Sequence, residues 1–145
     1  GNGTTKGVDA DLADRVTKEN LDEAAAFAKA FAGKMNAVVA ITGAIDIVAD
    51  VEKAYCIYNG RPEMSSITGT GCQLSALTAA FVTAHQEQPL EAAAAAVCAM
   101  GLAGETAYAR LSELDGNATY RNYIIDAIYR MNGEALEAGA KFEVR

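Results

Sequence analysis

Residues 65–81 read SSITGTGCQLSALTAAF, and in this stretch the chain changes from extended to helical character. Before it, apolar residues occur in short runs of strand length. After it, apolar side chains recur at the spacing of one helix face, at Leu74, Leu77, Phe81 and Ala84. Glycines at 69 and 71 favour a turn between the extended segment and the helix. The sequence therefore places Gly69-Thr70-Gly71-Cys72 where an extended segment enters a helix over Gln73–His85.

Three short apolar runs precede this turn and predict neighbouring strands. Residues 37–42 (AVVAIT) form a continuous run, which is typical of a strand buried on both faces. Residues 45–48 (IDIV) alternate as a half-exposed strand does, and residues 55–58 (YCIY) have the length of a third strand. Gly43-Ala44 is expected to turn the chain, and Asn59-Gly60 is a strong signal for a tight turn.

A helix is expected before these strands. Asn20 can cap it, Glu23 three residues later can complete a capping box, and Gly33 is the expected stop. Residues 6–10 could be the end of a strand, and residues 11–17 are weakly helical. The expected inward positions of the capped helix recur at helical spacing, with Phe27 at their edge: Leu21, Ala24, Ala25, Ala28 and Phe31.

Two further helices are expected after the glycine turn. Pro89 stands at a favoured first position of a helix that runs to about Leu114. Gly101 and Gly104 inside it would each cost about 1 kcal/mol relative to alanine, so they suggest close backbone packing. Thr119 can cap a last helix, which runs through Leu136 and is followed by a short tail or edge strand. The expected inward positions of that helix are Ile124, Ile125, Ile128 and Met131.

These elements predict an α/β domain with helices against a sheet. The helices outnumber the strands they would cover, and the run at 37–42 needs more neighbours than the chain offers. An open sheet edge is a hazard for pairing with other chains. We therefore expect another polypeptide segment to complete the sheet.

Composition limits the partners. The chain has 145 residues, the size of one domain, with 51% hydrophobic and 21% charged residues and a formal net charge of −7. No basic run is present, which argues against nucleic acid or an anionic membrane as main partner. The apolar run at 92–104 is too short and too rich in alanine to predict a membrane span. Three scattered cysteines and one histidine exclude a disulfide framework and the usual zinc patterns, and they suit the cytoplasm.

The turn at Gly69–Cys72 has the chemistry of an anion site. The first N–H groups of a helix lack partners within it and carry roughly half a positive charge. Glycine lets a phosphate approach these groups closely, and the same field favours a thiolate at Cys72. Phosphate binding next to a proton acceptor suggests phosphoryl transfer to a hydroxyl, a reaction that needs positioning and charge more than a strong base.

Other interpretations remain open. Cys72 could be a small packed residue, since short motifs have many chance matches. Covalent cysteine catalysis would need a nearby histidine, and His85 lies too far along the same helix, where it is expected to interact with the last carbonyls. Asp46 and Asp50 could bind a metal but are more simply explained as solvated carboxylates. Cys98 and three tyrosines are expected to pack: Tyr120, Tyr123 and Tyr129.

The order of the motifs resembles that of one enzyme family. VVAITGAIDIVAD, YNG, ITGTGCQLSALTAAF and MGLAGETA, in this order, resemble the C-terminal half of hydroxyethylthiazole kinase, a member of the ribokinase-like superfamily. The likeness extends from KGVDA at residues 6–10 to the last helix. The cysteine of TGTGC is specific to this family, because most relatives in the superfamily have aspartate there.

The resemblance implies an activity and roles for individual residues. The family phosphorylates the hydroxyl of 4-methyl-5-(2-hydroxyethyl)thiazole with ATP and Mg²⁺ in thiamine biosynthesis and salvage. Cys72 matches its catalytic cysteine, Gly69 a substrate contact and Thr42 an ATP contact, while Thr70 and Gly71 complete the anion hole. No metal ligand is assigned to this chain.

The resemblance also implies an assembly. Family members are longer, form trimers with active sites between subunits, and use an N-terminal half that supplies sheet strands, an arginine for ATP and acidic residues near magnesium. We therefore expect residues 1–145 to be the C-terminal half of one ribokinase-like domain, completed by the same or a separate chain. Two alternatives are another small-molecule kinase of the superfamily and a non-catalytic fragment that only assembles.

Overall fold

The computed structural model describes residues 16–145 and divides into two compact units. The sheet unit comprises residues 16–58 and 142–145, and the helical unit comprises residues 59–141. Each unit is described by itself. The strand end expected at residues 6–10 and most of the weak helix expected at 11–17 lie outside the described residues.

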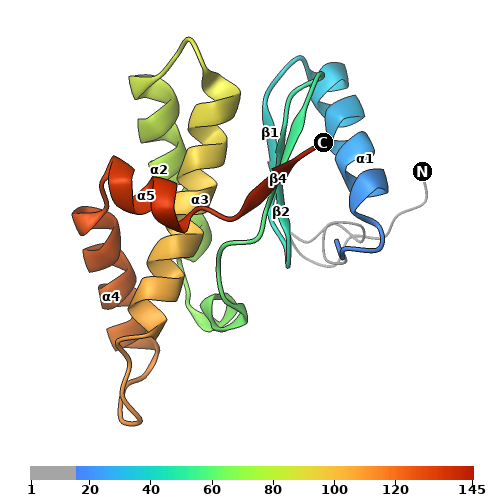
Figure 1. Ribbon diagram of the computed structural model, residues 1–145. Helices are drawn as coiled ribbons and strands as arrows, with labels where there is room; N and C mark the ends of the chain where they lie inside the picture. Colours follow the sequence, from blue (N-terminus) through green and yellow to red (C-terminus); the bar gives the residue numbers. More distant parts are fainter. Residues whose placement is uncertain (1–15) are drawn as a thin grey trace. The chain divides into compact units, whose positions relative to one another are not determined.

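The sheet unit contains a four-stranded antiparallel sheet among the described residues, in the order β1-β2-β3-β4 (Figure 1). The strands are β1 (Val39–Ile41), β2 (Asp46–Ala49), β3 (Ala54–Ile57) and β4 (Phe142–Val144). Short connections join β1 to β2 and β2 to β3, as the sequence predicts. The C-terminal segment returns to pair with β3, which confirms the edge strand expected there.

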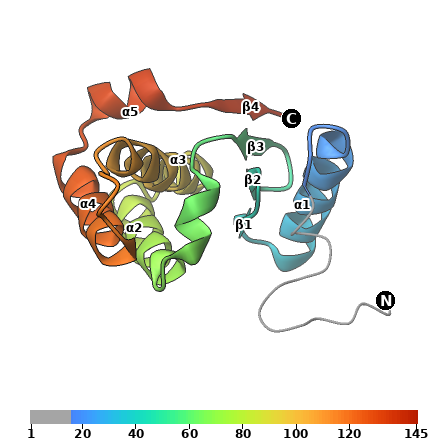
Figure 2. The same cartoon turned by 90° about the horizontal axis from the view of Figure 1, so that it is seen from below.

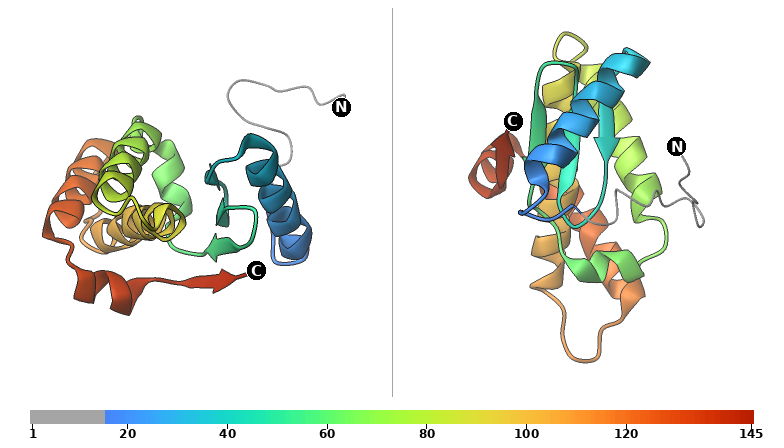
Figure 3. Two further views of the ribbon diagram at one scale, coloured as in Figure 1. Left: turned by 90° about the horizontal axis from the view of Figure 1, so that it is seen from above. Right: turned by 90° about the vertical axis from the view of Figure 1, so that its right-hand side faces the viewer.

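Helix α1 (Leu21–Met35) packs against one face of this sheet (Figure 3). Small residues of α1 meet alternate residues of β2 and β3, because successive side chains of a strand point to opposite faces. This core contains Val16, Leu21, Ala25, Ala28, Ile45, Ile47, Ala49, Ala54 and Cys56.

The ends of α1 differ from those predicted. The side chain of Asn20 makes no capping bond; its Oδ1 accepts the N–H of Thr17 at 2.7 Å. The helix continues past Gly33 to Met35 and is capped by Asn36, whose φ of 49° is left-handed. Asparagine tolerates that conformation, so it can end a helix as glycine does. Gly33 is small for another reason: a Cβ there would lie 3.1 Å from the side chain of Val51.

The predicted inward face of α1 is partly wrong. Leu21, Ala25 and Ala28 are buried as expected, but the fourth buried residue is Ala32. Phe31 is exposed, as is Phe27, and their rings stack with centroids 6.2 Å apart. Periodicity predicts which side of a helix is apolar. It does not predict how closely the sheet packs against that side, and here the packing is close enough that mainly alanines fit.

The predicted burial of the first two strands is reversed. Residues 37–42 form only the short edge strand β1, in which Val39 and Ile41 are half-buried and Ala40 is exposed. In β2, by contrast, Ile47, Val48 and Ala49 are all buried. The reason is strand order, since β2 has a neighbour on each side whereas β1 has one, and hydrophobic pattern alone does not reveal order.

The helical unit contains α2 (Thr70–Ala84), α3 (Pro89–Tyr108), α4 (Asn117–Arg130) and α5 (Gly133–Gly139), preceded by the short 3₁₀ helix η2 (Pro62–Ser66). Figure 2 shows α2 and α4 beside α3, with which both are in contact. Their shared core is Ile67, Met100, Ala103, Ala107, Tyr120, Ile124 and Ala127.

Several helix boundaries in this unit differ from those expected. Helix α2 begins at Thr70 rather than Gln73, and α3 ends at Tyr108 rather than Leu114. Thr119 caps nothing, because α4 already begins at Asn117. The expected single last helix is two helices, because the side chain of Asn132 accepts the N–H of Ala135 at 2.9 Å and starts α5.

The predicted inward positions are partly confirmed. Leu74 and Leu77 of α2 pack against the core of the helical unit, although no residue of α2 is fully buried. In α4, Ile124 is fully buried and Ile128 packs beside it, whereas Ile125 is exposed.

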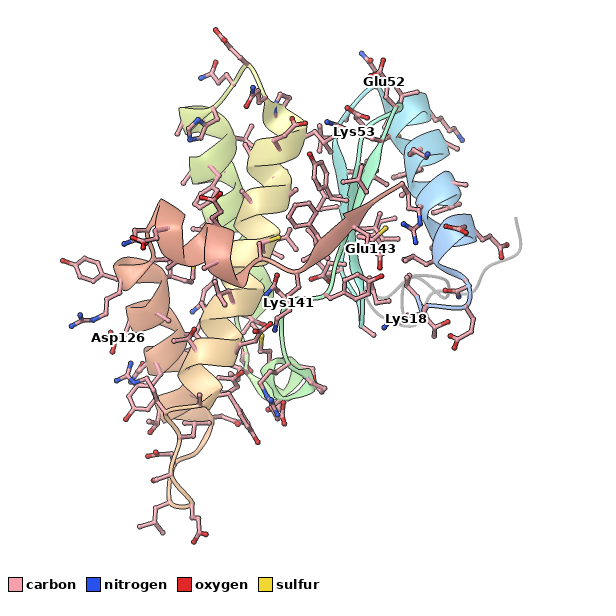
Figure 4. All side chains as sticks on the ribbon, in the orientation of Figure 1. Lys18, Glu52, Lys53, Asp126, Lys141 and Glu143 are labelled. Carbon is pink, nitrogen blue, oxygen red and sulfur yellow. The ribbon has the colours of Figure 1, made fainter. Side chains whose placement is uncertain are left out.

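Asn59 and Gly60 do not form the predicted tight turn. Asn59 is buried, and its side-chain amide donates to Glu105 Oε1 at 3.1 Å and to the carbonyl of Gly139 at 3.0 Å. Its Oδ1 accepts the N–H of Lys141 at 2.8 Å. Lys141, labelled in Figure 4, also pairs with Glu105 Oε2 at 2.8 Å. Asn59, which the sequence indicates as a surface turn residue, is thus a buried residue that links its own segment and residues 139–141 to α3.

The close packing expected at the glycines of α3 is confirmed. A Cβ at Gly101 would lie 2.7 Å from the backbone carbon of Asn59, and one at Gly104 would lie 2.2 Å from Sδ of Met64. Both neighbours belong to the same chain, so the packing does not require another molecule.

Helix α3 has the length and composition of a membrane span, and it is the one such helix among residues 16–145. In its apolar window, 72% is buried within the structure, as in the core helix of a globular domain. The apolar composition of α3 is therefore weak evidence for a membrane.

Candidate functional site

The N-terminus of α2 is built around a left-handed glycine. Gly69 precedes the helix with a φ of +95°, a conformation that other residues rarely adopt. The N–H of Gln73 donates to the carbonyl of Gly69 at 3.0 Å. The N–H groups of Thr70, Gly71 and Cys72 therefore precede the first bond of the helix and are available to an anion.

The space around this turn is open. A Cβ built on Gly69 or Gly71 would meet no atom within 4 Å. The turn is anchored on its inner side by Ile67, which is buried in the core of the helical unit, and the hydroxyl of Thr70 donates to the Ile67 carbonyl at 3.4 Å. The backbone is thus held from within and accessible from outside, which is the arrangement that a phosphate-binding turn needs.

Cys72 lies in the first turn of α2 and is exposed, while Cys56 and Cys98 are buried. Burial raises the pKa of the Cys56 thiol above its usual value, so that thiol is a poorer proton acceptor at neutral pH. The predicted placement of the three cysteines is confirmed. That Cys72 faces a cleft stays a prediction.

Gln73, the residue after Cys72, is a polar residue near the turn that the sequence does not single out. Its Oε1 is buried and has no hydrogen-bond partner among the described residues. Glutamine in an amphipathic helix is ordinary, so the sequence carries no signal for this unpaired acceptor.

His85 and the tyrosines have mostly structural roles. The backbone N–H of His85 donates to Phe81 and Val82 carbonyls, which ends α2 as expected. The hydroxyl of Tyr120 donates to the carbonyl of Gly104 at 3.0 Å within the core. Tyr129 is 88% exposed, so the expectation that it packs is wrong.

Thr42 follows β1 in the sheet unit and is exposed. The predicted site residues are therefore divided: Gly69, Thr70, Gly71 and Cys72 are brought together by one turn of the helical unit, and Thr42 belongs to the other unit.

Asp46 and Asp50 each bind backbone at a turn of the sheet. Oδ1 of Asp50 accepts the N–H groups of Glu52 and Lys53, each at 2.8 Å. Oδ1 of Asp46 accepts the N–H of Gly43 at 2.9 Å, and burial raises the pKa of the Asp46 carboxyl to about 6. Within residues 16–145, no three acidic, histidine or cysteine side chains gather in a way that could hold a metal ion.

The raised pKa of Asp46 predicts a stability effect. The folded chain holds the Asp46 proton more tightly than the unfolded chain, whose value is 3.8. Stability from this group is therefore complete below pH 3.8 and is lost as the pH rises through about 6. We expect Asp46→Asn to raise the free energy of unfolding at pH 8 by about 1–3 kcal/mol, with the difference from the parent vanishing near pH 4. Denaturant unfolding of both proteins between pH 4 and 8 measures this difference, and a pH-independent gap would contradict the assignment.

Comparison with known proteins places the chain in a family. Residues 1–134 match the model of the hydroxyethylthiazole kinase family. The chain is 57% identical over 143 residues to a hydroxyethylthiazole kinase of Clostridium acetobutylicum, covering 99% of this chain and 52% of that protein. It is 39% identical over 132 residues to hydroxyethylthiazole kinase 2 of Methanosphaera stadtmanae, covering 90% and 46%.

A solved structure shares the fold. The hydroxyethylthiazole kinase protein of Pyrococcus horikoshii OT3 superposes with a TM-score of 0.77 at 33% sequence identity, covering 88% of this chain and 48% of that one. The expected α/β fold, a partial ribokinase-like one, is thereby confirmed. The chain spans about half the length of the curated relatives it matches, and it belongs to the hydroxyethylthiazole kinase family.

Proposed function

We propose that this chain is part of a kinase that transfers the γ-phosphoryl group of ATP to the hydroxyl of 4-methyl-5-(2-hydroxyethyl)thiazole, a step of thiamine biosynthesis and salvage. Family membership supports the reaction class. The observation that carries the proposal is the exposed Cys72 in the first turn of α2, directly after the left-handed Gly69. Thr42 would contact ATP and Gly69 the thiazole substrate.

The proposed step uses the thiolate of Cys72 as proton acceptor. The substrate hydroxyl oxygen bonds to the γ-phosphorus while the bond from that phosphorus to the β–γ bridging oxygen breaks, and ADP leaves. The hydroxyl proton passes to Cys72, and the N–H groups of Thr70 and Gly71 stabilise charge on the phosphoryl oxygens. Because such transition states are loose, a weak base in the right place suffices.

Magnesium would neutralise charge on the ATP phosphates. Mg²⁺ is usually held by one or two carboxylates together with phosphate oxygens. The part of the chain that the structure describes offers no cluster of three ligands, so no role for magnesium is assigned to its residues. Under this proposal the protein ligands of magnesium come from the remainder of the domain.

We further propose that residues 1–145 are the C-terminal half of one ribokinase-like domain in a cytoplasmic homotrimer, completed by the same or a separate chain. Two findings support completion: the relatives are about twice as long, and β1 ends the sheet with half-exposed Val39 and Ile41. A strand from the missing half on this edge would satisfy its free backbone groups.

An activity assay tests the proposed function. The complete protein that carries this chain should convert ATP and the thiazole alcohol to ADP and the phosphate ester, and should do so far faster than with pyridine or pyrimidine alcohols. The isolated 145-residue chain is the matched comparison and should be inactive. Faster phosphorylation of another alcohol would favour a different kinase of the superfamily. If the complete protein phosphorylates no alcohol, the alternative of a non-catalytic fragment that only assembles would be favoured.

A further inference from the structure

Thr42 and Asp46 stand opposite each other across the turn between β1 and β2. The antiparallel register pairs Ala40 with Val48 and Ile41 with Ile47, the last pair of the ladder. Thr42 and Asp46 are the next residue on each side, and continuing the register by one step sets them opposite each other. Directly opposed residues lie on the same face of a sheet, with Cβ atoms about 5 Å apart. The two side chains are therefore neighbours by register.

This pair lies on the sheet face opposite α1. Ile41 and Ile47 pack in the core beneath α1, and the next residue of a strand points to the other face. In the same cross-strand row, Asp46 pairs with Ile57, which is fully buried. An apolar neighbour on one side explains why this carboxyl is poorly solvated and why the pKa of Asp46 is raised.

The carboxyl of Asp46 also holds the turn itself. Its Oδ1 accepts the N–H of Gly43 at 2.9 Å, and that N–H belongs to the peptide group that follows Thr42. The bond therefore fixes the plane of the Thr42 carbonyl and the direction in which Thr42 leaves β1. Asp50 makes comparable bonds at the turn between β2 and β3, so the chain contains a natural comparison.

We propose that Asp46 is a positioning residue for nucleotide binding, which orients Thr42 by binding the Gly43 amide and by packing beside Thr42 on the same face. This proposal rests on the proposed function, in which Thr42 contacts ATP. The hydrogen bond from the Gly43 amide to the Asp46 oxygen orients Thr42, and the negative charge of Asp46 is not needed for this. An uncharged residue with an acceptor oxygen in the same place, such as asparagine, should therefore orient Thr42 equally well.

The test compares four substitutions in the complete kinase. Asp46→Ala should raise KM for ATP about 3- to 10-fold, the range for one lost hydrogen bond, with kcat at saturating ATP within about twofold of the parent. Asp46→Asn should keep KM within about twofold. Thr42→Val should raise KM as Asp46→Ala does. Asp50→Ala, the matched control, should lower the melting temperature and leave KM unchanged.

Hydrogen exchange and calorimetry separate the possible failures. The Gly43 amide should exchange faster in Asp46→Ala than in the parent and in Asp46→Asn. Faster exchange with an unchanged KM for ATP would overturn the positioning role and leave the proposed function intact. An equal rise of KM in Asp50→Ala would also overturn it, because the effect would then be general loosening of the sheet. If calorimetric titration of the parent detects no ATP binding, both the proposed function and this inference are wrong.

Discussion

Cys72→Ala is expected to lower kcat of the complete kinase by about 10²- to 10⁴-fold, the usual contribution of a positioned proton acceptor. The dissociation constant for ATP should change little, because under the proposed function Cys72 accepts a proton only in the transition state. Steady-state kinetics together with calorimetric titration of ATP measure the two quantities separately.

Two further variants sharpen this result. Cys72→Asp should retain or raise activity, because a carboxylate can accept the same proton and the helix dipole favours a negative group in the first turn of α2. Ala79→Ser is the matched control: Ala79 is an exposed small residue two turns further along α2, and its replacement should leave kcat near that of the parent. Parent-like kcat in Cys72→Ala would show that the thiol is a bystander.

Gly101→Ala is expected to destabilise the protein by about 2–3 kcal/mol, although alanine is the better helix former. The added Cβ would lie 2.7 Å from the backbone carbon and 2.9 Å from the backbone oxygen of Asn59. Backbone cannot move aside as a flexible side chain can, so α3 must shift and weaken the bonds that Asn59 makes to Glu105 and Lys141. Denaturant unfolding measures the loss.

Gly133→Ala provides the control for this change. Gly133 is the first residue of α5, and a Cβ there would meet no atom within 4 Å. The substitution should leave stability unchanged or raise it by up to about 1 kcal/mol, through helix propensity alone. Equal effects of the two substitutions would show that the contact at Gly101 is not tight.

Much of the candidate site could be predicted from the sequence because it is local. Gly69, Thr70, Gly71 and Cys72 are consecutive, so one φ of +95° and the start of α2 are enough to bring their backbone groups together. The exposure of Cys72 follows from its place in the first turn. The sequence indicates Asp46 only as a weak metal candidate, because its role depends on the strand register, which brings it near Thr42, and on its buried neighbour Ile57.

The sequence by itself determined the kinds of element, their order and the family, because hydrophobic period, glycine and proline act over a few neighbouring residues. It also predicted close packing at Gly101 and Gly104 of α3, which the structure confirms. Only the tertiary structure decided that β1 is an exposed edge and β2 an interior strand, that Phe31 faces outward while Ala32 is buried, and that Asn59 is a buried anchor. These outcomes depend on which segments, distant in sequence, become neighbours. A local hydrophobic pattern shows that a side chain can be buried. Whether it is buried depends on which segment from elsewhere in the chain packs against it.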